Sequence, residues 1–174
     1  MKKLLIVVDY QIDFVNGTLG FENADKLDEA IYNKILNYKE NNYDVIYTFD
    51  THYENYFNTI EGSYLPVKHC ILGSNGHNLY GKVATLFDKS KDVYFEKETF
   101  PSLKMANYLA TKDYDEVTLC GLVSNICVFS NAIMVKASLP NAKIIIERSL
   151  TDSFDKNLQE KSYDVLKGLH IEVI

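Results

Sequence analysis

Residues 117–128 read Val-Thr-Leu-Cys-Gly-Leu-Val-Ser-Asn-Ile-Cys-Val, an apolar run that meets Gly121 and then continues with helical character. This order predicts a strand, a tight turn and a helix that Ser124 or Asn125 caps at its N-terminus. Cys127 is then expected in the first helical turn, where unpaired backbone N–H groups and the helix dipole favour an anion. A thiol at such a position can have a lowered pKa and act as a nucleophile.

Strands and helices alternate along the whole chain. The short β-branched runs that predict strands are residues 3–9, 44–50, 92–96, 116–121, 143–147 and 170–174. The segments with helical periodicity are residues 24–41, 102–111, 126–137 and 156–169. The buried face of the first helix is formed by Leu27, Ile31, Ile35 and Tyr38. Asn23 is expected to cap that helix, and Ser102 the next. The alternation predicts the α/β class, with a largely parallel sheet covered by helices on both faces.

The composition is that of an ordinary globular domain. The chain has 174 residues, enough for one domain with a sizeable core, and 47% of them are hydrophobic and 24% charged. The net charge of −6 argues against nucleic acid as a partner. The apolar run at residues 4–8 is too short to cross a membrane, and no signal-peptide cleavage site follows it. The three cysteines show no paired spacing, which indicates a reducing, cytoplasmic setting.

Chemically reactive side chains follow several of the predicted strands. Asp9 ends the first strand, residues 50–52 (Asp-Thr-His) end the second, Lys97 ends the third and Cys127 follows the fourth. Because ligands of open α/β sheets bind beyond the carboxyl ends of the strands, we expect a base, a cation and a thiol on one edge. Asp9 would accept the thiol proton, Lys97 would favour the thiolate, and Cys127 would attack an acyl carbon. Taken singly, the three have other interpretations: a turn cap, a solvated charge and a buried apolar side chain.

Three stretches resemble the motifs of one family, the isochorismatase-like cysteine hydrolases. Residues 9–14 (Asp-Tyr-Gln-Ile-Asp-Phe) resemble D-x-Q-x-D-F, residues 97–102 resemble K-x-x-[YF]-S-A-F, and residues 121–128 resemble G-x-x-T-D-x-C-V. Within that family the chain most resembles the nicotinamidases, from residue 4 to residue 174. The resemblance implies a single domain, residues 1–174, with a doubly wound sheet of about six parallel strands and helices on both faces.

The resemblance also implies functional residues. It implies a catalytic triad of Asp9, Lys97 and Cys127. It further implies a non-proline cis peptide bond between Leu122 and Val123, which would turn the Val123 amide toward the oxyanion beside the amide of Cys127. Phe14 would stack on the substrate ring. The walls of the substrate pocket are expected from Phe14, Leu65, Phe100 and Leu122.

The irregular segment 51–79 holds three of the four histidines, and long ordered loops of this kind are usually functional. His52 follows Asp50 in a D-x-H pair, and residues 66–70 (Pro-Val-Lys-His-Cys) resemble the family's W-P-x-H-C. The resemblance implies a divalent metal, Zn²⁺ or alternatively Fe²⁺ or Mn²⁺, on the ligands Asp50, His52, Glu61 and His69. The metal would anchor the ring nitrogen of the substrate. The alternative is that His52 hydrogen-bonds the Asp9 edge and that His69 is an ordinary loop residue.

The expected function is hydrolysis of nicotinamide to nicotinate and ammonia through a thioester on Cys127. The expected partner is a small-molecule amide, with no nucleic acid and no membrane, and a homo-oligomer remains open. One alternative is a hydrolase of another small amide that needs no metal. A second is a thiol redox protein with Cys127 as its peroxidatic thiol, although Cys120 is expected to point into the core rather than to resolve it. A third is a non-catalytic binding module, which the retained triad disfavours.

Overall fold

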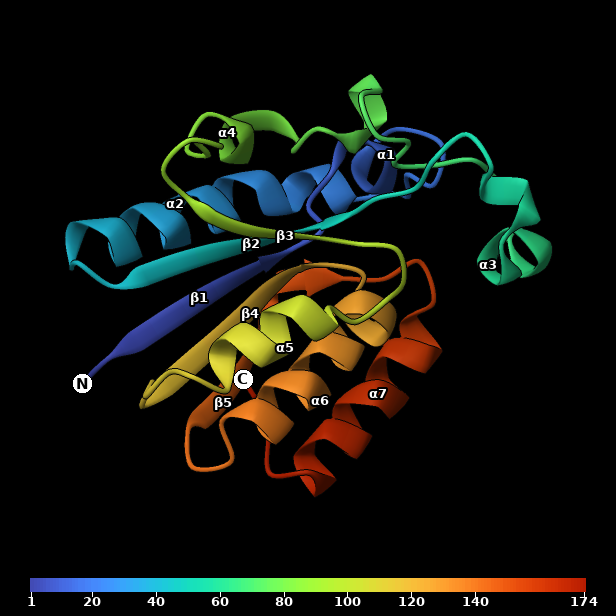
Figure 1. The fold of residues 1–174 in the computed structure, drawn as a ribbon. Helices are drawn as coiled ribbons and strands as arrows, with labels where there is room; N and C mark the ends of the chain where they lie inside the picture. Colours follow the sequence, from blue (N-terminus) through green and yellow to red (C-terminus); the bar gives the residue numbers. More distant parts are fainter.

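The computed structural model describes residues 1–174 and contains one sheet of six parallel strands, in the order β3-β2-β1-β4-β5-β6 (Figure 1). The strands are β1 (Lys3–Val8), β2 (Asp44–Asp50), β3 (Val93–Lys97), β4 (Glu116–Leu122), β5 (Lys143–Asp152) and β6 (Glu172–Val173). From β1 the chain winds to one edge of the sheet, returns to β4 and winds to the other edge. The predicted α/β fold is confirmed. Its switch point, where ligands of such sheets bind, lies between β1 and β4.

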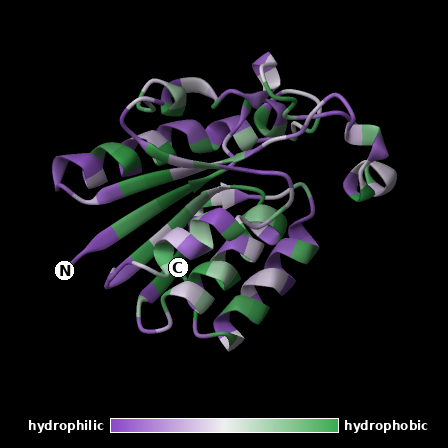
Figure 2. Ribbon diagram, viewed as in Figure 1, coloured by the Kyte–Doolittle hydropathy of each residue, from purple (hydrophilic) through white to green (hydrophobic).

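Helices cover both faces of this sheet (Figure 1). On one face pack α2 (Leu27–Glu40) and α4 (Gly81–Ala84), and on the other pack α5 (Leu103–Leu109), α6 (Phe129–Ser138) and α7 (Lys156–Gly168). The strands are apolar along much of their length, whereas the helices mix apolar and polar residues (Figure 2). This pattern follows because the sheet is buried on both faces, while each helix keeps one face in water.

Most predicted elements are present, with shifts at their ends. The four residues predicted for the buried face of α2 are all buried. Ser102 caps α5 as predicted, because its side chain accepts the N–H of Met105 at 3.2 Å. The prediction of Asn23 as a cap is wrong: its side chain accepts no helix N–H, since the chain makes a 3-10 turn at Ala24–Lys26 before α2 begins.

Short elements gather at the carboxyl edge of the sheet. They are α1 (Ile12–Val15), the 3-10 turn Tyr56–Asn58, α3 (Ile60–Tyr64) and the 3-10 turn Asn75–His77. In Figure 1, α3 stands away from the sheet at the right. The segment between β2 and α4 returns to the edge through two isolated bridges, His52 with Ile71 and Leu79 with Gln11. These elements carry no periodic signal in the sequence because none exceeds five residues.

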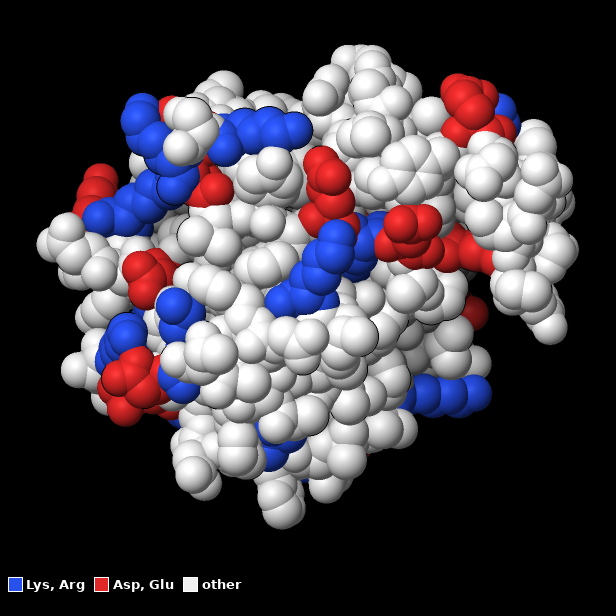
Figure 3. Space-filling view, viewed as in Figure 1, with Lys and Arg blue, Asp and Glu red and all other residues white.

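On the face shown in Figure 3, lysine and arginine side chains lie among aspartates and glutamates in small mixed groups. That face therefore presents no broad basic area of the kind that binds nucleic acid. None of the helices combines the length and the apolar composition that a membrane crossing requires.

Candidate active site

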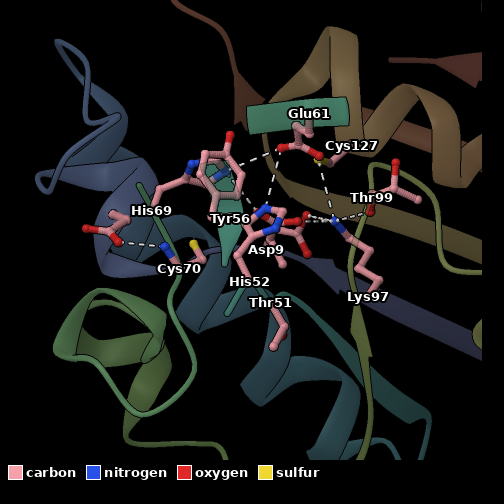
Figure 4. Close-up of polar contacts among 12 residues, drawn as sticks. Asp9, Thr51, His52, Tyr56, Glu61, His69, Cys70, Lys97, Thr99 and Cys127 are labelled. Carbon is pink, nitrogen blue, oxygen red and sulfur yellow. Dashed lines mark hydrogen bonds and ion pairs between the residues drawn. The ribbon is translucent and has the colours of Figure 1, made fainter. Parts of the chain in front are cut away.

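Three reactive side chains meet at the carboxyl edge of the sheet. Lys97 Nζ lies 2.6 Å from Asp9 Oδ2 and 3.7 Å from Cys127 Sγ (Figure 4). Lys97 also contacts Asp50 Oδ1 at 3.3 Å and donates to the Thr99 oxygen at 3.1 Å. Asp9, Lys97 and Cys127 are each at most 5% exposed. The base, cation and thiol predicted from the strand ends therefore form one buried cluster.

Backbone geometry brings Asp9 and Cys127 together. Asp9 follows β1 with φ 45°, a left-handed turn that leads the chain off the sheet, and Thr48 on β2 donates to Asp9 Oδ1 at 2.7 Å. On β4, Gly121 has φ 102°, and a Cβ there would lie 2.0 Å from the Val8 oxygen. Only glycine fits such a position. Its absence of a side chain lets β4 close onto β1 just before the turn that carries Cys127.

The turn that carries Cys127 differs from the predicted capped helix. Residues 124–128 form a π turn, closed by an i→i+5 hydrogen bond of 3.2 Å, and α6 begins only after it. Neither Ser124 nor Asn125 caps the turn with its side chain, so that prediction is wrong. The reason is that the π turn already begins at Ser124, so Val123 occupies the cap position and both residues lie within the turn. π turns of this kind are frequent at functional sites.

Burial decides the protonation of this cluster. Burial raises the pKa of the Cys127 thiol well above its usual value; Lys97 opposes this effect, and Asp9 reinforces it. Burial likewise raises the pKa of Asp9, against the lowering effect of Lys97. Burial lowers the pKa of Lys97, but the charges of Asp9 and Cys127 outweigh it and raise that pKa. The lowered thiol pKa expected from the helix N-terminus is therefore wrong, and a base must take the proton during the reaction.

A second cluster lies beside the first and shares Asp50 with it (Figure 4). One ligand atom from each of Asp50, His52, Glu61 and His69 lies within 4.8 Å of the others. His52 Nε2 is 3.0 Å from Asp50 Oδ2 and 3.4 Å from Glu61 Oε1. His69 Nε2 is 3.3 Å and 3.5 Å from the same two oxygens. The four predicted ligands thus converge, and this largely buried cluster could bind a metal ion.

The donor atoms fit a divalent cation. His69 Nδ1 donates to the Val67 oxygen at 2.8 Å, which leaves Nε2 to face the cluster. His52 Nε2 is buried and faces the Asp50 and Glu61 carboxylates without a well-aligned hydrogen bond. Burial lowers the pKa of both histidines, but the carboxylates of Asp50 and Glu61 outweigh it and raise the pKa to about 9 for His52 and about 10 for His69. The cluster therefore attracts positive charge, and two imidazoles with two carboxylates suit Zn²⁺, Fe²⁺ or Mn²⁺.

A cavity of about 380 Å³ connects the two clusters, within the size range of small-molecule sites. Its polar residues include Cys127 together with Asp50, Glu61 and His69. Its apolar walls are formed by Phe14, Leu19, Phe21, Leu65, Phe100, Val123, Ile126 and Phe154. No lysine or arginine lines the cavity.

Three of the four residues predicted as pocket walls, Phe14, Leu65 and Phe100, line this cavity. The fourth, Leu122, does not: it is fully buried in the core beneath α2. Val123, the first residue after β4, lines the cavity in its place. The peptide bond between Leu122 and Val123 is cis, as the resemblance implies.

The sequence-based prediction missed several residues of the site. Gln11 is fully buried and binds the backbone of Asp50 on both sides, donating to its oxygen at 2.9 Å and accepting its N–H at 2.8 Å. Tyr56 packs its ring against His52 and His69, with centroids 4.7 and 5.2 Å apart. Gln11 stands inside the first motif and could have been found there. Tyr56 and the more distant pocket walls have no local signal, because their positions depend on how the loops fold.

A model of the isochorismatase domain matches residues 3–174 of this chain. The chain belongs to the isochorismatase family. It is 30% identical over 167 residues to an uncharacterized isochorismatase family protein, PncA, of Bacillus subtilis (strain 168), with 90% of this chain and 89% of that protein covered.

Several solved structures share the fold. A nicotinamidase/pyrazinamidase PncA from Bacillus subtilis matches with a TM-score of 0.88 and 27% identity over 99% of both chains. A pyrazinamidase of Pyrococcus horikoshii in complex with zinc has a TM-score of 0.84 and 22% identity, covering 100% of this chain and 99% of its own. An N-carbamoylsarcosine amidase from Thermoplasma acidophilum has 0.79 and 24%, covering 99% and 95%. The last two establish the fold alone.

Proposed function

We propose that this isochorismatase-family hydrolase is a nicotinamidase, which converts nicotinamide to nicotinate and ammonia through a thioester on Cys127. The observation that carries the proposal is the apolar cavity that joins the thiol to the metal-ligand cluster. A flat heteroaromatic amide suits both ends, because its carboxamide can meet the sulfur while its ring nitrogen faces the cluster. The Phe14 ring lies 5.7 Å from the His69 ring between centroids and offers a face for stacking.

The charge of the cavity favours a neutral substrate. Asp50 and Glu61 line it, and no lysine or arginine does. Lys97 lies outside the lining and is paired with both Asp9 and Asp50. The two carboxylates would offset the charge of a bound divalent metal, so a substrate with a carboxylate of its own, such as N-carbamoylsarcosine, would find no surplus positive charge to pair with. A neutral aromatic amide avoids that cost, which supports nicotinamide over an anionic amide such as N-carbamoylsarcosine.

Acylation would begin with the transfer of the Cys127 thiol proton to Asp9, as the sulfur attacks the carboxamide carbon. Lys97 lowers the pKa of Asp9, which favours the ionised base, and stabilises the developing sulfur charge from 3.7 Å. The backbone amides of Val123 and Cys127 would stabilise the tetrahedral oxyanion. As the C–N bond breaks, Asp9 returns its proton to the leaving nitrogen, and ammonia departs from the thioester.

Deacylation would use the same base. Asp9 takes a proton from water, whose oxygen attacks the thioester carbon, and the sulfur leaves and recovers the proton from Asp9. A divalent metal on the Asp50, His52, Glu61 and His69 side chains, which we infer to be Zn²⁺, would supply a Lewis acid for the ring nitrogen when bound. Phe14 and Phe100, on the apolar walls, would keep the ring oriented and exclude bulk water.

The thiol redox alternative has little support from the other two thiols. Cys120 is fully buried, and its Sγ donates to the Ile6 oxygen at 3.6 Å within the sheet. Cys70 is fully buried as well. A resolving cysteine must reach the oxidised sulfur from an accessible position, so these side chains favour the hydrolase.

The test is an ammonia-release assay on the metal-loaded chain, with nicotinamide, pyrazinamide and N-carbamoylsarcosine compared at equal concentration. We expect nicotinamide to exceed N-carbamoylsarcosine in kcat/KM by at least about a hundredfold, the scale of an unpaired like charge in a closed site. A chelator should lower nicotinamide turnover. Faster ammonia release from N-carbamoylsarcosine would overturn the proposal that nicotinamide is the substrate. Peroxide consumption without ammonia release would favour the redox alternative.

A further inference from the structure

We propose that Asp13 is the positioning residue of the metal cluster: its carboxylate fixes the backbone from which His69 and His52 present their Nε2 atoms. This inference rests on the metal site of the proposed function. Asp13 belongs to α1, carries no role in the chemistry described above, and is only 9% exposed.

The Asp13 carboxylate holds two backbone N–H groups, one on each oxygen. Oδ2 accepts the N–H of Cys70 at 2.7 Å, which is the dashed line at Cys70 in Figure 4, and Oδ1 accepts the N–H of Thr18 at 3.2 Å. No lysine, arginine or histidine pairs with this carboxylate. A carboxylate buried without a cation must be satisfied by hydrogen bonds. Here it binds the residue next to a metal ligand.

Cys70 passes this restraint to both histidines. It follows His69 directly, and its own oxygen accepts the N–H of His52 at 3.0 Å. Its φ of 46° is unusual for a residue with a side chain, so the surroundings must hold it. With Asp13 on its N–H and His52 on its oxygen, the Cys70 backbone spaces the two imidazoles. Their centroids lie 4.6 Å apart.

The next residue along α1 acts on the same junction. Phe14 packs its ring against the His69 ring at 5.7 Å between centroids and a 58° angle, while Asp13 holds Cys70. Two adjacent residues of α1 therefore contact two adjacent residues of the segment between β2 and α4, His69 and Cys70. Gly76 closes the other side of the carboxylate, since a Cβ there would lie 2.0 Å from Asp13 Oδ2. The side chain of Asp13 therefore fits only because residue 76 is a glycine.

The test compares Asp13→Asn with a matched control elsewhere. Asparagine offers one oxygen to two N–H groups, so its amide nitrogen must face a donor. Asp28→Asn is the control, because Asp28 also accepts two backbone N–H groups, from Lys82 at 2.8 Å and Val83 at 3.2 Å, and also has a glycine, Gly81, against its carboxylate. Co²⁺ is the probe: its dissociation constant is measured by competition with a chelator, and its visible absorption reports ligand geometry.

We expect Asp13→Asn to raise the Co²⁺ dissociation constant by about tenfold to a hundredfold, the usual effect of losing an outer-shell partner, and to alter the absorption bands. Asp28→Asn should lower the melting temperature about as much as Asp13→Asn does, while its Co²⁺ dissociation constant and absorption stay as in the wild type. If Asp13→Asn does not fold, Gly76→Ala, which displaces the carboxylate and keeps its charge, should shift both metal readouts in the same direction.

Two results would overturn the inference. One is wild-type Co²⁺ affinity and absorption in Asp13→Asn, which would reduce the residue to a structural role. The other is a wild-type chain that binds no Co²⁺, whether or not it releases ammonia. A cobalt effect in a chain that leaves nicotinamide intact would support the inference and remove the proposed substrate, so the two failures are distinguishable.

Discussion

The two halves of the site are built in different ways. The triad residues lie at strand ends: Asp9 follows β1, Lys97 ends β3, and Cys127 follows β4 across one turn. The hydrogen-bonded register of the parallel strands fixes where these residues lie along the sheet; Asp50, for example, pairs with Lys97. In the metal cluster only Asp50 belongs to a strand, and the other three ligands come from the segment between β2 and α4. That half relies on isolated bridges and on side-chain clamps such as Gln11 and Asp13.

Asp50 joins the two halves. Its Oδ1 contacts Lys97 at 3.3 Å, and its Oδ2 lies 3.0 Å from His52 and 3.3 Å from His69. In the proposed mechanism, the strands therefore provide the nucleophile and the base, while the segment between β2 and α4 provides the part of the site that orients the substrate. Substitutions in the strand half (Asp9, Lys97 and Cys127) should therefore abolish turnover. Substitutions in the loop half (the metal ligands between β2 and α4) should only lower it.

The largest effect is expected at the nucleophile. Cys127→Ala removes the atom that bonds to the substrate, so ammonia release from nicotinamide should fall by roughly 10⁴-fold or more. Cys120→Ala is the control: that thiol lies in the sheet, hydrogen-bonded to Ile6, and its loss should lower the melting temperature while leaving most of kcat/KM. Appreciable turnover by Cys127→Ala would remove the thioester mechanism.

A smaller loss is expected in the loop half. His52→Ala, or treatment of the wild type with a chelator, should lower kcat/KM for nicotinamide by about a hundredfold, because the ring loses its anchor and the carboxamide is misplaced. Metal analysis should show stoichiometric metal in the wild type and loss in His52→Ala. His170→Asn is the control, since His170 is exposed, has φ 59° and lies after α7, away from the cluster. An unchanged kcat/KM after metal removal would mean that the loop half does not orient substrate.

The pH profile tests the base of the strand half. Burial raises the pKa of Asp9, so below that pKa Asp9 carries a proton and cannot accept one from Cys127. Activity should therefore fall as the pH decreases, with the acid limb of kcat/KM above about 3.9, the ordinary value for aspartate. Circular dichroism at each pH shows that the fold persists. An acid limb at or below the ordinary value would contradict the assignment of Asp9.

The smallest effect is expected from the hydrogen bond that Thr48 donates to Asp9 Oδ1 at 2.7 Å. That bond lowers the pKa of Asp9, so Thr48→Val should move the acid limb to higher pH by about one unit and lower kcat/KM by up to about tenfold. Thr118→Val is the control, because Thr118 is also a buried strand threonine with one side-chain partner, Tyr38 at 3.0 Å. Equal pH profiles in both variants would show that Thr48 does not tune the base.

The same contrast explains what the sequence could predict. The strands and the residues at their ends follow from short β-branched runs, so the sequence alone predicts that Asp9, Lys97 and Cys127 share one edge. The resemblance to nicotinamidases added the four metal ligands. The π turn before α6, the pocket walls Phe21 and Phe154, and the clamp at Asp13 escaped prediction. Each depends on contacts between distant segments, which no local periodicity records.

The thiol pKa shows the same limit for electrostatics. A helix N-terminus and a lysine are visible in the sequence, and both favour a thiolate. The burial of Cys127, which is 4% exposed, and the two nearby carboxylates emerge only in the folded chain, and together they outweigh the effect of the lysine on the thiol pKa. The pKa of a thiol depends on both its burial and its charged neighbours, so the sequence alone cannot give the direction in which its pKa shifts.

The most direct test of the central claim is to trap the acyl group on Cys127. The metal-loaded wild-type chain is mixed with excess nicotinamide, quenched in acid during turnover, and examined by intact mass and peptide mapping. We predict a mass increase of one nicotinoyl group, located on Cys127 and absent from Cys127→Ala. An acyl group on any other residue, or steady nicotinate production with Cys127 unmodified at every quench time, would contradict the account.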